Sequence, residues 1–249
     1  MILIIIAAVI AAVCLYLTAP KKAEKGEEIF TGRAFAHRGL YDNEAGIPEN
    51  SAASFRRAVE NGFGCELDVQ LTKDEKLVVF HDDTLDRACG VSGLVREKSF
   101  EEIRSLRLFG TDEIIPTFEE VLGIVDGKIP LIVELKSELP DKALNVRNCE
   151  ITCGMLSAYK GQYCIESFDP TIVGWFRKNA PDIIRGQLSM APDKYPKSYS
   201  IWLKLLLGYL GMNFLGRPNF IAYDVESAQP VTLKMCKALG AFHASWTCR

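Results

Sequence analysis

Short runs of apolar residues recur along the chain, and stretches with a helical spacing of apolar residues lie between them. Continuous, β-branched apolar runs are typical of buried strands, whereas apolar residues three and four apart are typical of amphipathic helices. Because strands and helices alternate, the pattern predicts an α/β fold with a parallel sheet or barrel. The predicted strands are Ala34–His37, Gly64–Asp68, Leu131–Lys136, Tyr163–Phe168, Ile184–Leu188, Phe220–Asp224 and Phe242–Thr247.

The segments between these strands carry helix start signals. Ser99 and Thr117 are each followed three residues later by a glutamate, which is the capping-box pattern. A cap at the start and apolar residues at helical spacing after it predict a helix. The predicted helices are Ser51–Asn61, Ser99–Arg107, Thr117–Val125, Asp141–Lys160, Asp169–Asn179 and Gln229–Leu239.

A further apolar stretch, Ile201–Leu210, lies between Asp193 and Pro218. It is too short and too interrupted for a comfortable membrane span. We interpret it as an outer helix that packs on the sheet. The alternative is an interfacial helix that rests on a lipid surface, with Trp202 and Tyr209 at headgroup depth.

One apolar run, Leu77–Phe80, follows the Gly64–Asp68 strand after only a short polar turn. A connection of this length cannot make a parallel crossover. The run is therefore predicted to pair back as an antiparallel hairpin, outside the barrel wall. Such a hairpin places His81 roughly opposite Glu66.

Acidic residues within these strands point to a metal site. Glu66 and Asp68 are two residues apart, so they face the same side of their strand. Two carboxylates among apolar neighbours are costly unless a partner neutralises them, and a divalent cation does this well. If the stretch around Glu66 and Asp68 is considered alone, an ordinary exposed hairpin with a charged face is the alternative interpretation.

Two other predicted strands also end in charged or titratable side chains. His37 and Arg38 close the strand at Ala34, and Glu134 and Lys136 share one face of the strand at Leu131. In a βα barrel the active site lies at the carboxyl ends of the strands. Three strand ends that carry these side chains predict one functional site.

The N-terminal stretch is apolar, since residues 1–20 contain no charged side chain. About 19 helical residues span roughly 29 Å, close to the thickness of a bilayer core. We therefore predict an uncleaved membrane anchor at 1–20, a charged linker at 21–32 and one domain at 33–249. Lys21, Lys22 and Lys25 follow the anchor, so the positive-inside rule predicts a single-pass protein with a cytoplasmic domain.

Composition narrows the function classes. The length of 249 residues fits one βα barrel, and the net charge of −3 gives no support for nucleic-acid binding. The 8 cysteines show no disulfide or zinc pattern, because Cys149 and Cys153 have no second ligand pair. Scattered cysteines are typical of a reducing compartment.

Five motifs follow one another along the chain: HRG at 37–39, PENS at 48–51, ELDVQLTKD at 66–74, VVFHDD at 78–83 and VELK at 133–136. This ordered set resembles the glycerophosphodiester phosphodiesterases, in a membrane-anchored bacterial form, from about Ala34 to the end of the chain. The resemblance implies a TIM-type (β/α)8 barrel in phospholipid metabolism. Such an enzyme hydrolyses glycerophosphodiesters, including lysophospholipids, to glycerol 3-phosphate or a lysophosphatidate and an alcohol.

The same resemblance implies a divalent metal held by Glu66, Asp68 and Glu134. Glu49 lies near these residues in the motif order and either joins them or orients a ligand; a first-turn helix acid is the alternative for it. An all-carboxylate set favours Mg²⁺ or Ca²⁺ over zinc.

The basic residues have implied roles as well. Arg38 and Lys136 are expected to bind the substrate phosphate, Arg38 as a fork and Lys136 as a point charge. His37 and His81 are the candidates for general acid and base, since histidine titrates near neutral pH. Which histidine is the acid, and whether water or a substrate hydroxyl attacks, stay open from the sequence.

The family's pattern continues with another helix and strand after the seventh predicted strand. We therefore expect a barrel that lacks its last strand and helix. A truncated barrel that binds phosphate and metal but is catalytically weak or inactive is one alternative function. A phosphodiesterase similar to phosphoinositide phospholipase C, which would release a cyclic phosphate, is another.

Overall fold

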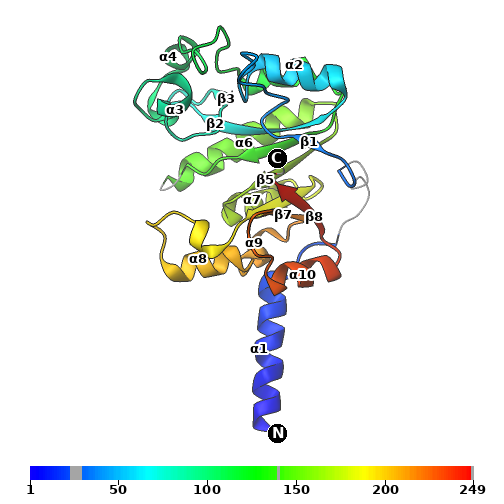
Figure 1. Cartoon of the computed structure of the whole chain (residues 1–249). Coiled ribbons are helices and arrows are strands. Elements are labelled where there is room, and N and C mark those ends of the chain that lie inside the picture. Colours follow the sequence, from blue (N-terminus) through cyan, green and yellow to red (C-terminus); the bar gives the residue numbers. More distant parts are fainter. Residues whose placement is uncertain (23–29, 139–140, 248–249) are drawn as a thin grey trace. The chain divides into compact units, whose positions relative to one another are not determined.

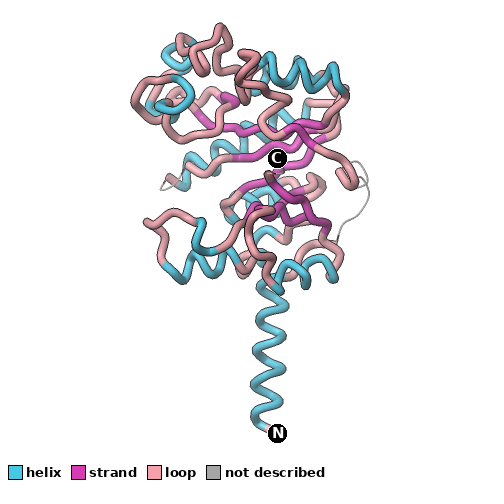
Figure 2. Tube along the Cα trace, viewed as in Figure 1, coloured by secondary structure: helices cyan, strands magenta, loops and turns pink. Residues whose placement is uncertain are grey.

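The computed structural model describes residues 1–22, 30–138 and 141–247, so Lys25 and the last two residues of the chain lie outside the described residues. The chain forms two compact units: Glu28–Ile165 is one, and Met1–Glu27 with Glu166–Arg249 is the other. Strands alternate with helices in both units, as the apolar pattern predicts (Figure 1, Figure 2).

Three parallel strands form the sheet of the unit Glu28–Ile165. The long strand β2 (Gly64–Leu71) lies between β1 (Phe35–Ala36) and β4 (Leu131–Leu135). All 8 residues of β2 are buried, as expected for a strand covered on both faces. The register of β2 and β4 places Asp68 beside Glu134. Two candidate metal ligands from distant parts of the chain are therefore neighbours.

Strand β3 (Leu77–Val79) pairs antiparallel with β2, which confirms the predicted hairpin. The ladder ends where Val69 pairs with Val79. His81 lies two residues beyond this last pair, and the Phe80 N–H still donates to the Asp68 carbonyl at 2.9 Å, so the hairpin brings His81 toward the Glu66 end of β2.

Two helices of this unit begin at the predicted capping boxes. Ser99 and Thr117 each form a full capping box with the glutamate three residues on. The helices are α2 (Ala52–Asn61), α3 (Asp86–Cys89), α4 (Phe100–Arg104), α5 (Phe118–Val125) and α6 (Lys142–Ala158), with the 3-10 turn η2 (Val95–Glu97).

The short helix α3 was not predicted from the sequence. It lies in the inserted segment, which we define as residues 81–116, between β3 and the cap of α5. Leu85 and Ala88 of this segment pack on Val78 and Phe80 in one hydrophobic cluster. The inserted segment therefore has its own core, continuous with the end of the hairpin.

In the other unit, β6 (Arg185–Ser189), β7 (Phe220–Asp224) and β8 (Phe242–Trp246) are parallel neighbours. Strand β5 (Tyr163–Ser167) crosses the boundary between the units. The described residues thus contain strands at all seven predicted positions, besides β3. The helices are α1 (Ile2–Thr18), α7 (Pro170–Asn179), α8 (Ile201–Gly208), α9 (Asn213–Gly216) and α10 (Val231–Ala238), with the turn η3 (Pro192–Lys194).

The N-terminal apolar stretch forms α1, which has 17 residues. No helix among residues 1–22, 30–138 and 141–247 is long and apolar enough to cross a membrane, so the predicted anchor at 1–20 is not supported. The C-terminal end of α1 is fixed to its unit by Arg217. The guanidinium donates to the carbonyls of Tyr16 and Ala19, at 2.7 and 2.8 Å, and stacks on the Tyr16 ring.

The apolar stretch after Asp193 forms α8, as predicted. Leu207 is buried, and its carbonyl accepts a hydrogen bond from the Ser189 hydroxyl of β6 at 2.9 Å. One side of α8 therefore packs on the sheet. Trp202 on the other side is 75 % exposed.

Candidate active site

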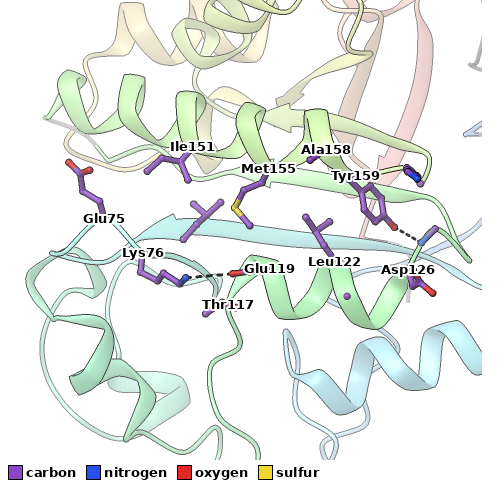
Figure 3. Close-up of a pocket in the computed structure, with 15 residues that line it drawn as sticks. Glu75, Lys76, Thr117, Glu119, Leu122, Asp126, Ile151, Met155, Ala158 and Tyr159 are labelled. Atoms are coloured by element: carbon purple, nitrogen blue, oxygen red, sulfur yellow. Dashed lines mark hydrogen bonds and ion pairs between the residues drawn. The ribbon is translucent and has the colours of Figure 1, made fainter.

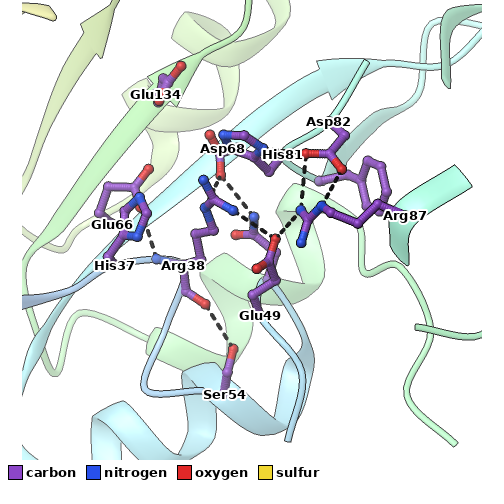
Figure 4. Close-up of polar contacts among 12 residues, drawn as sticks. His37, Arg38, Glu49, Ser54, Glu66, Asp68, His81, Asp82, Arg87 and Glu134 are labelled. Atoms are coloured by element: carbon purple, nitrogen blue, oxygen red, sulfur yellow. Dashed lines mark hydrogen bonds and ion pairs between the residues drawn. The ribbon is translucent and has the colours of Figure 1, made fainter. Parts of the chain in front are cut away.

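The predicted site residues all belong to the unit Glu28–Ile165. His37 and Arg38 follow β1, Glu66 and Asp68 lie in β2, and Glu134 lies in β4. Figure 4 shows their side chains around one space, with His81 and Glu49 on the far side of Arg38. The structure thus brings together residues that are up to 99 positions apart in the chain, from His37 to Lys136 (136 − 37).

Three carboxylates and one ammonium form what we call the strand-end cluster: Glu66, Asp68, Glu134 and Lys136. One oxygen from each carboxylate lies within 4.8 Å of the others, and all three side chains are buried. Lys136 Nζ lies 2.8 Å from Glu134 Oε1 and 3.3 Å from Asp68 Oδ1. Three buried acids with one ammonium leave a surplus of negative charge.

Burial and mutual repulsion set the titration of these groups. Burial raises the pKa of Glu134, with the Asp68 carboxylate also acting in that direction. Burial would raise the pKa of Asp68 too, but Lys136, His81 and Arg38 hold it well below its usual range. Burial opposes the charge of Lys136, yet the carboxylates around it raise its pKa. The fold therefore favours the ionised form of Asp68 and the protonated form of Lys136, whereas it opposes the negative charge of Glu134.

The cluster fits a hard divalent cation. Its donors are all carboxylate oxygens on two adjacent strands. Asp68 Oδ1 is buried and accepts no hydrogen bond among the described residues, although Lys136 Nζ lies 3.3 Å away. Glu49 is not part of this group. Its Oε1 instead accepts from Arg38 Nη1 at 2.9 Å and from Arg87 Nη2 at 2.6 Å. Glu49 thus orients two arginines in this structure.

Arg38 is held from several sides. Its backbone N–H donates to Glu66 Oε2 at 2.9 Å, and its Nε lies 3.8 Å from Asp68 Oδ2. Its φ of 57° is in the left-handed region, which is uncommon for a residue with a side chain. Such a conformation persists only where its surroundings enforce it, and it is frequent at functional sites. The adjacent Gly39 has a φ of 78°, and a Cβ there would lie 2.3 Å from Ser54 Oγ.

His37 lies against the cluster, with Nε2 3.9 Å from Glu66 Oε2. Burial, followed by the Arg38 charge, lowers the pKa of His37 to about 4. The imidazole is therefore neutral near pH 7 and is able to accept a proton.

His81 is held by the residue that follows it. His81 Nδ1 lies 2.6 Å from Asp82 Oδ1. Burial would raise the pKa of Asp82, but hydrogen bonds from His81 and Arg87 lower it far below its usual range. An ionised carboxylate at Nδ1 fixes the ring and directs the other nitrogen outward.

Sequence reasoning missed three polar residues that support the site. Arg87 binds Asp82 and Glu49, Gln70 donates to the carbonyls on both sides of His81, and Asn50 donates to Asp68 Oδ2 at 2.9 Å. Gln70 was visible as the next same-face position after Asp68 on its strand. Nothing in the sequence pattern relates Arg87 to His81.

A separate groove lies between α5 and α6 (Figure 3). Its volume is about 930 Å³, and Leu122, Met155 and Tyr159 contribute to its lining. None of the candidate catalytic or metal-binding residues lines it. The chemistry of this unit is therefore concentrated at the strand ends and not in its large groove.

Residues 37–249 match a family model that is described as "Glycerophosphoryl diester phosphodiesterase family". A glycerophosphodiester phosphodiesterase of Caldanaerobacter subterraneus is 46% identical over 110 residues, 41% of this chain and 44% of that protein. YhdW of Bacillus subtilis, provisionally named a glycerophosphodiester phosphodiesterase, is 44% identical over 228 residues, 82% of this chain and 90% of that protein.

A solved phosphodiesterase from Oleispira antarctica, in complex with the product sn-glycerol-3-phosphate, has a similar fold. The TM-score is 0.70 at 24% identity, covering 88% of this chain and 86% of that one. This likeness shows a curled parallel sheet with helices, consistent with the predicted TIM-type barrel. With the family match over most of its length, the chain belongs to the glycerophosphoryl diester phosphodiesterase family.

Proposed function

We propose that this protein hydrolyses glycerophosphodiesters to glycerol 3-phosphate and an alcohol. The observation that carries the proposal is the convergence of a carboxylate cluster, two histidines and the cationic side chains of Arg38 and Lys136 in one unit. The family match and the relatives named above support the same reaction.

Glu66, Asp68 and Glu134 would hold a divalent cation, Mg²⁺ or Ca²⁺. When bound, such a cation would polarise a phosphate oxygen and make a coordinated water more acidic. Lys136 and Arg38 lie at the edge of the same space. Their positive charges stabilise the negative charge that grows on the phosphate oxygens in the transition state.

The two histidines divide the proton transfers. His37, neutral at physiological pH, takes a proton from the attacking water as the water oxygen forms a bond to phosphorus. The bond from phosphorus to the leaving alcohol oxygen breaks, and His81 gives that oxygen its proton. Asp82 at Nδ1 stabilises the protonated imidazole before this transfer.

The test is a product assay with purified full-length protein and glycerophosphodiesters that differ in headgroup, lysophospholipids included. Release of glycerol 3-phosphate, or of a lysophosphatidate, with the free alcohol supports the proposal. Asp68→Asn is the matched inactive control, since it removes a cluster charge without changing size. Release of a cyclic phosphate as the end product would instead favour a reaction of the phosphoinositide phospholipase C kind. No release from any glycerophosphodiester with Mg²⁺ or Ca²⁺ present would contradict the proposal.

A further inference from the structure

We propose that Arg87 is a positioning residue for catalysis, through which the inserted segment holds the His81–Asp82 pair and Glu49 in one arrangement. The inference deepens the proposed function and rests on it for the identity of the reaction. It assigns a role to the inserted segment, which supplies no candidate proton-transfer or phosphate-binding group after His81.

The contacts of Arg87 are short and multiple (Figure 4). Its Nε donates to Asp82 Oδ2 at 2.6 Å, and its Nη2 donates to Asp82 Oδ1 at 3.0 Å. The same Nη2 donates to Glu49 Oε1 at 2.6 Å. The planar guanidinium therefore fixes both oxygens of one carboxylate and one oxygen of a second.

Each carboxylate that Arg87 holds contacts a group placed in the reaction. Asp82 Oδ1 lies 2.6 Å from His81 Nδ1, and Glu49 Oε1 accepts from Arg38 Nη1 at 2.9 Å. Arg87 thus connects a proton-transfer histidine with a phosphate-binding arginine. Without it, Asp82 would keep only its contact with His81 and Glu49 only its hydrogen bond from Arg38, with one fewer cation between the two carboxylates.

Arg87 is itself held by the inserted segment. Its guanidinium lies 5.4 Å from the centroid of the Phe109 ring. The Phe109 backbone N–H donates to the Ala88 carbonyl at 2.6 Å, and Ala88 is buried in the hydrophobic cluster of this segment. The start of α3 is therefore a fixed support for the guanidinium.

The backbone around His81 does not depend on Arg87. Gln70 Nε2 donates to the carbonyls of Phe80 and Asp82, at 2.8 and 2.9 Å, and its side chain is buried. Arg87, in contrast, is 45% exposed as a side chain. The two carboxylates that it binds each keep another partner, Asp82 at His81 Nδ1 and Glu49 at Arg38 Nη1, and the inserted segment has its own hydrophobic cluster. Removing the Arg87 side chain should therefore loosen the Asp82 and Glu49 side chains without unfolding the segment.

A matched control lies in the same segment. Arg104 also binds a carboxylate with two nitrogens, donating to Glu120 at 2.8 and 2.7 Å, and it also lies over a phenylalanine ring. Its side chain is 35% exposed. Glu120 contacts none of the proposed catalytic or metal-binding groups among the described residues. Arg104→Ala removes the same chemistry without touching the site.

The first experiment compares Arg87→Ala, Arg87→Lys and Arg104→Ala in the full chain. We expect Arg87→Ala to lower kcat by about 10-fold or more, because small displacements of catalytic groups have effects of this size. KM should change less than kcat, and Arg87→Lys should recover only part of the rate, since an ammonium cannot form the fork. Arg104→Ala should retain kcat. A kcat for Arg87→Ala equal to that of Arg104→Ala would overturn the proposal.

A double-mutant cycle tests whether Arg87 acts through Asp82. In the Asp82→Ala background, Arg87→Ala should lower kcat by much less than in the wild-type background. If Arg87→Ala lowered kcat by the same factor in both backgrounds, the proposal that Arg87 acts through Asp82 would be overturned.

A third readout does not require turnover. The ring nitrogen NMR signals of His81 should shift in Arg87→Ala, while those of His243 stay unchanged. Unchanged His81 signals would overturn the inference even if the enzyme is active. Shifted signals in a protein that hydrolyses no glycerophosphodiester would support the positioning contact and contradict the proposed function instead.

Discussion

The strand-end cluster and the inserted segment serve the same site but are built differently. In the strand-end cluster, Asp68 and Glu134 are fixed side by side because β2 and β4 pair in register. In the inserted segment, Arg87 comes from a helix of 4 residues, and its position depends on packing against Phe109. The first arrangement follows from strand geometry, whereas the second depends on tertiary contacts. Substitutions in the strand-end cluster should therefore abolish the reaction. Substitutions that remove the supporting contacts of Arg87 in the inserted segment should only weaken it.

The largest effect should come from the cluster. Removing divalent cations with EDTA, or Asp68→Asn, should lower turnover by about 10³-fold or more, because both remove charge stabilisation worth several kcal/mol. Added Mg²⁺ or Ca²⁺ should restore the chelated wild type but not Asp68→Asn. The measurement is glycerophosphodiester hydrolysis against metal concentration. Full turnover in thoroughly demetallated protein would contradict a metal role for the cluster.

The next largest effect on turnover should come from the two candidate proton-transfer residues, His37 and His81. His37→Ala and His81→Ala should each reduce turnover by about 10²-fold, the usual scale for a general acid or base. Because Arg38 and Lys136 remain, KM should change less than kcat. Steady-state kinetics on folded protein, verified by circular dichroism, measures both. Near-normal kcat in one variant would remove that histidine from proton transfer.

The pH dependence separates the two histidines. Burial and Arg38 lower the pKa of His37 from 6.5 to about 4, so the fold favours its neutral form. The resulting stability is fully present above 6.5 and is lost as pH falls through about 4. The acid limb of kcat/KM should then lie near pH 4 and fall about 10-fold per pH unit below it. A pH–rate profile between about pH 3.5 and 8 measures it.

A variant of His81 is the control for this pH–rate profile. His81→Asn should lower the whole curve and leave the acid limb in place. An acid limb near the ordinary histidine value, or one that persists in His37→Asn, would show that another group is the base.

Much of the strand-end cluster was predictable from the sequence. Glu66 and Asp68 share a face because strand side chains alternate, and Glu134 ends the next buried strand. The seven strand positions and both capping boxes were also predicted, because each depends on local pattern. Side-chain partners such as Glu49 with Arg87 were not, because 38 residues separate them and no periodicity relates them.

For the N-terminal helix, the prediction from the sequence is not supported by the structure. Its apolar composition predicted a membrane anchor, which the 17-residue helix α1 does not support. Composition alone could not show that Arg217 binds the carbonyls at the end of α1, since that arginine is about 200 residues away. The cytoplasmic location inferred from Lys21 and Lys22 stays a prediction.

The smallest effect should come from Gln70, which lies in β2 but acts on the start of the inserted segment. Gln70→Leu keeps the approximate volume and leaves the Phe80 and Asp82 carbonyls without this donor, at a cost of about 1–3 kcal/mol of stability. Since those carbonyls flank His81, kcat should also fall, by about 3-fold to 10-fold, as positions near the catalytic ring relax. Thermal denaturation and steady-state kinetics measure the two effects.

Gln187 offers the matched comparison in the other unit. It is equally buried, and its Nε2 donates to the carbonyls of Ser167, Phe168 and Leu188. Gln187→Leu should therefore lower the melting temperature by a similar amount, because the same kind of buried bonds is lost. Only Gln70→Leu should lower kcat beyond what its stability loss explains. If both variants lose stability and kcat in equal measure, Gln70 acts on folding alone. The fixed backbone of His81 would then not require this bond, and the inserted segment would be held by its own core and by Arg87.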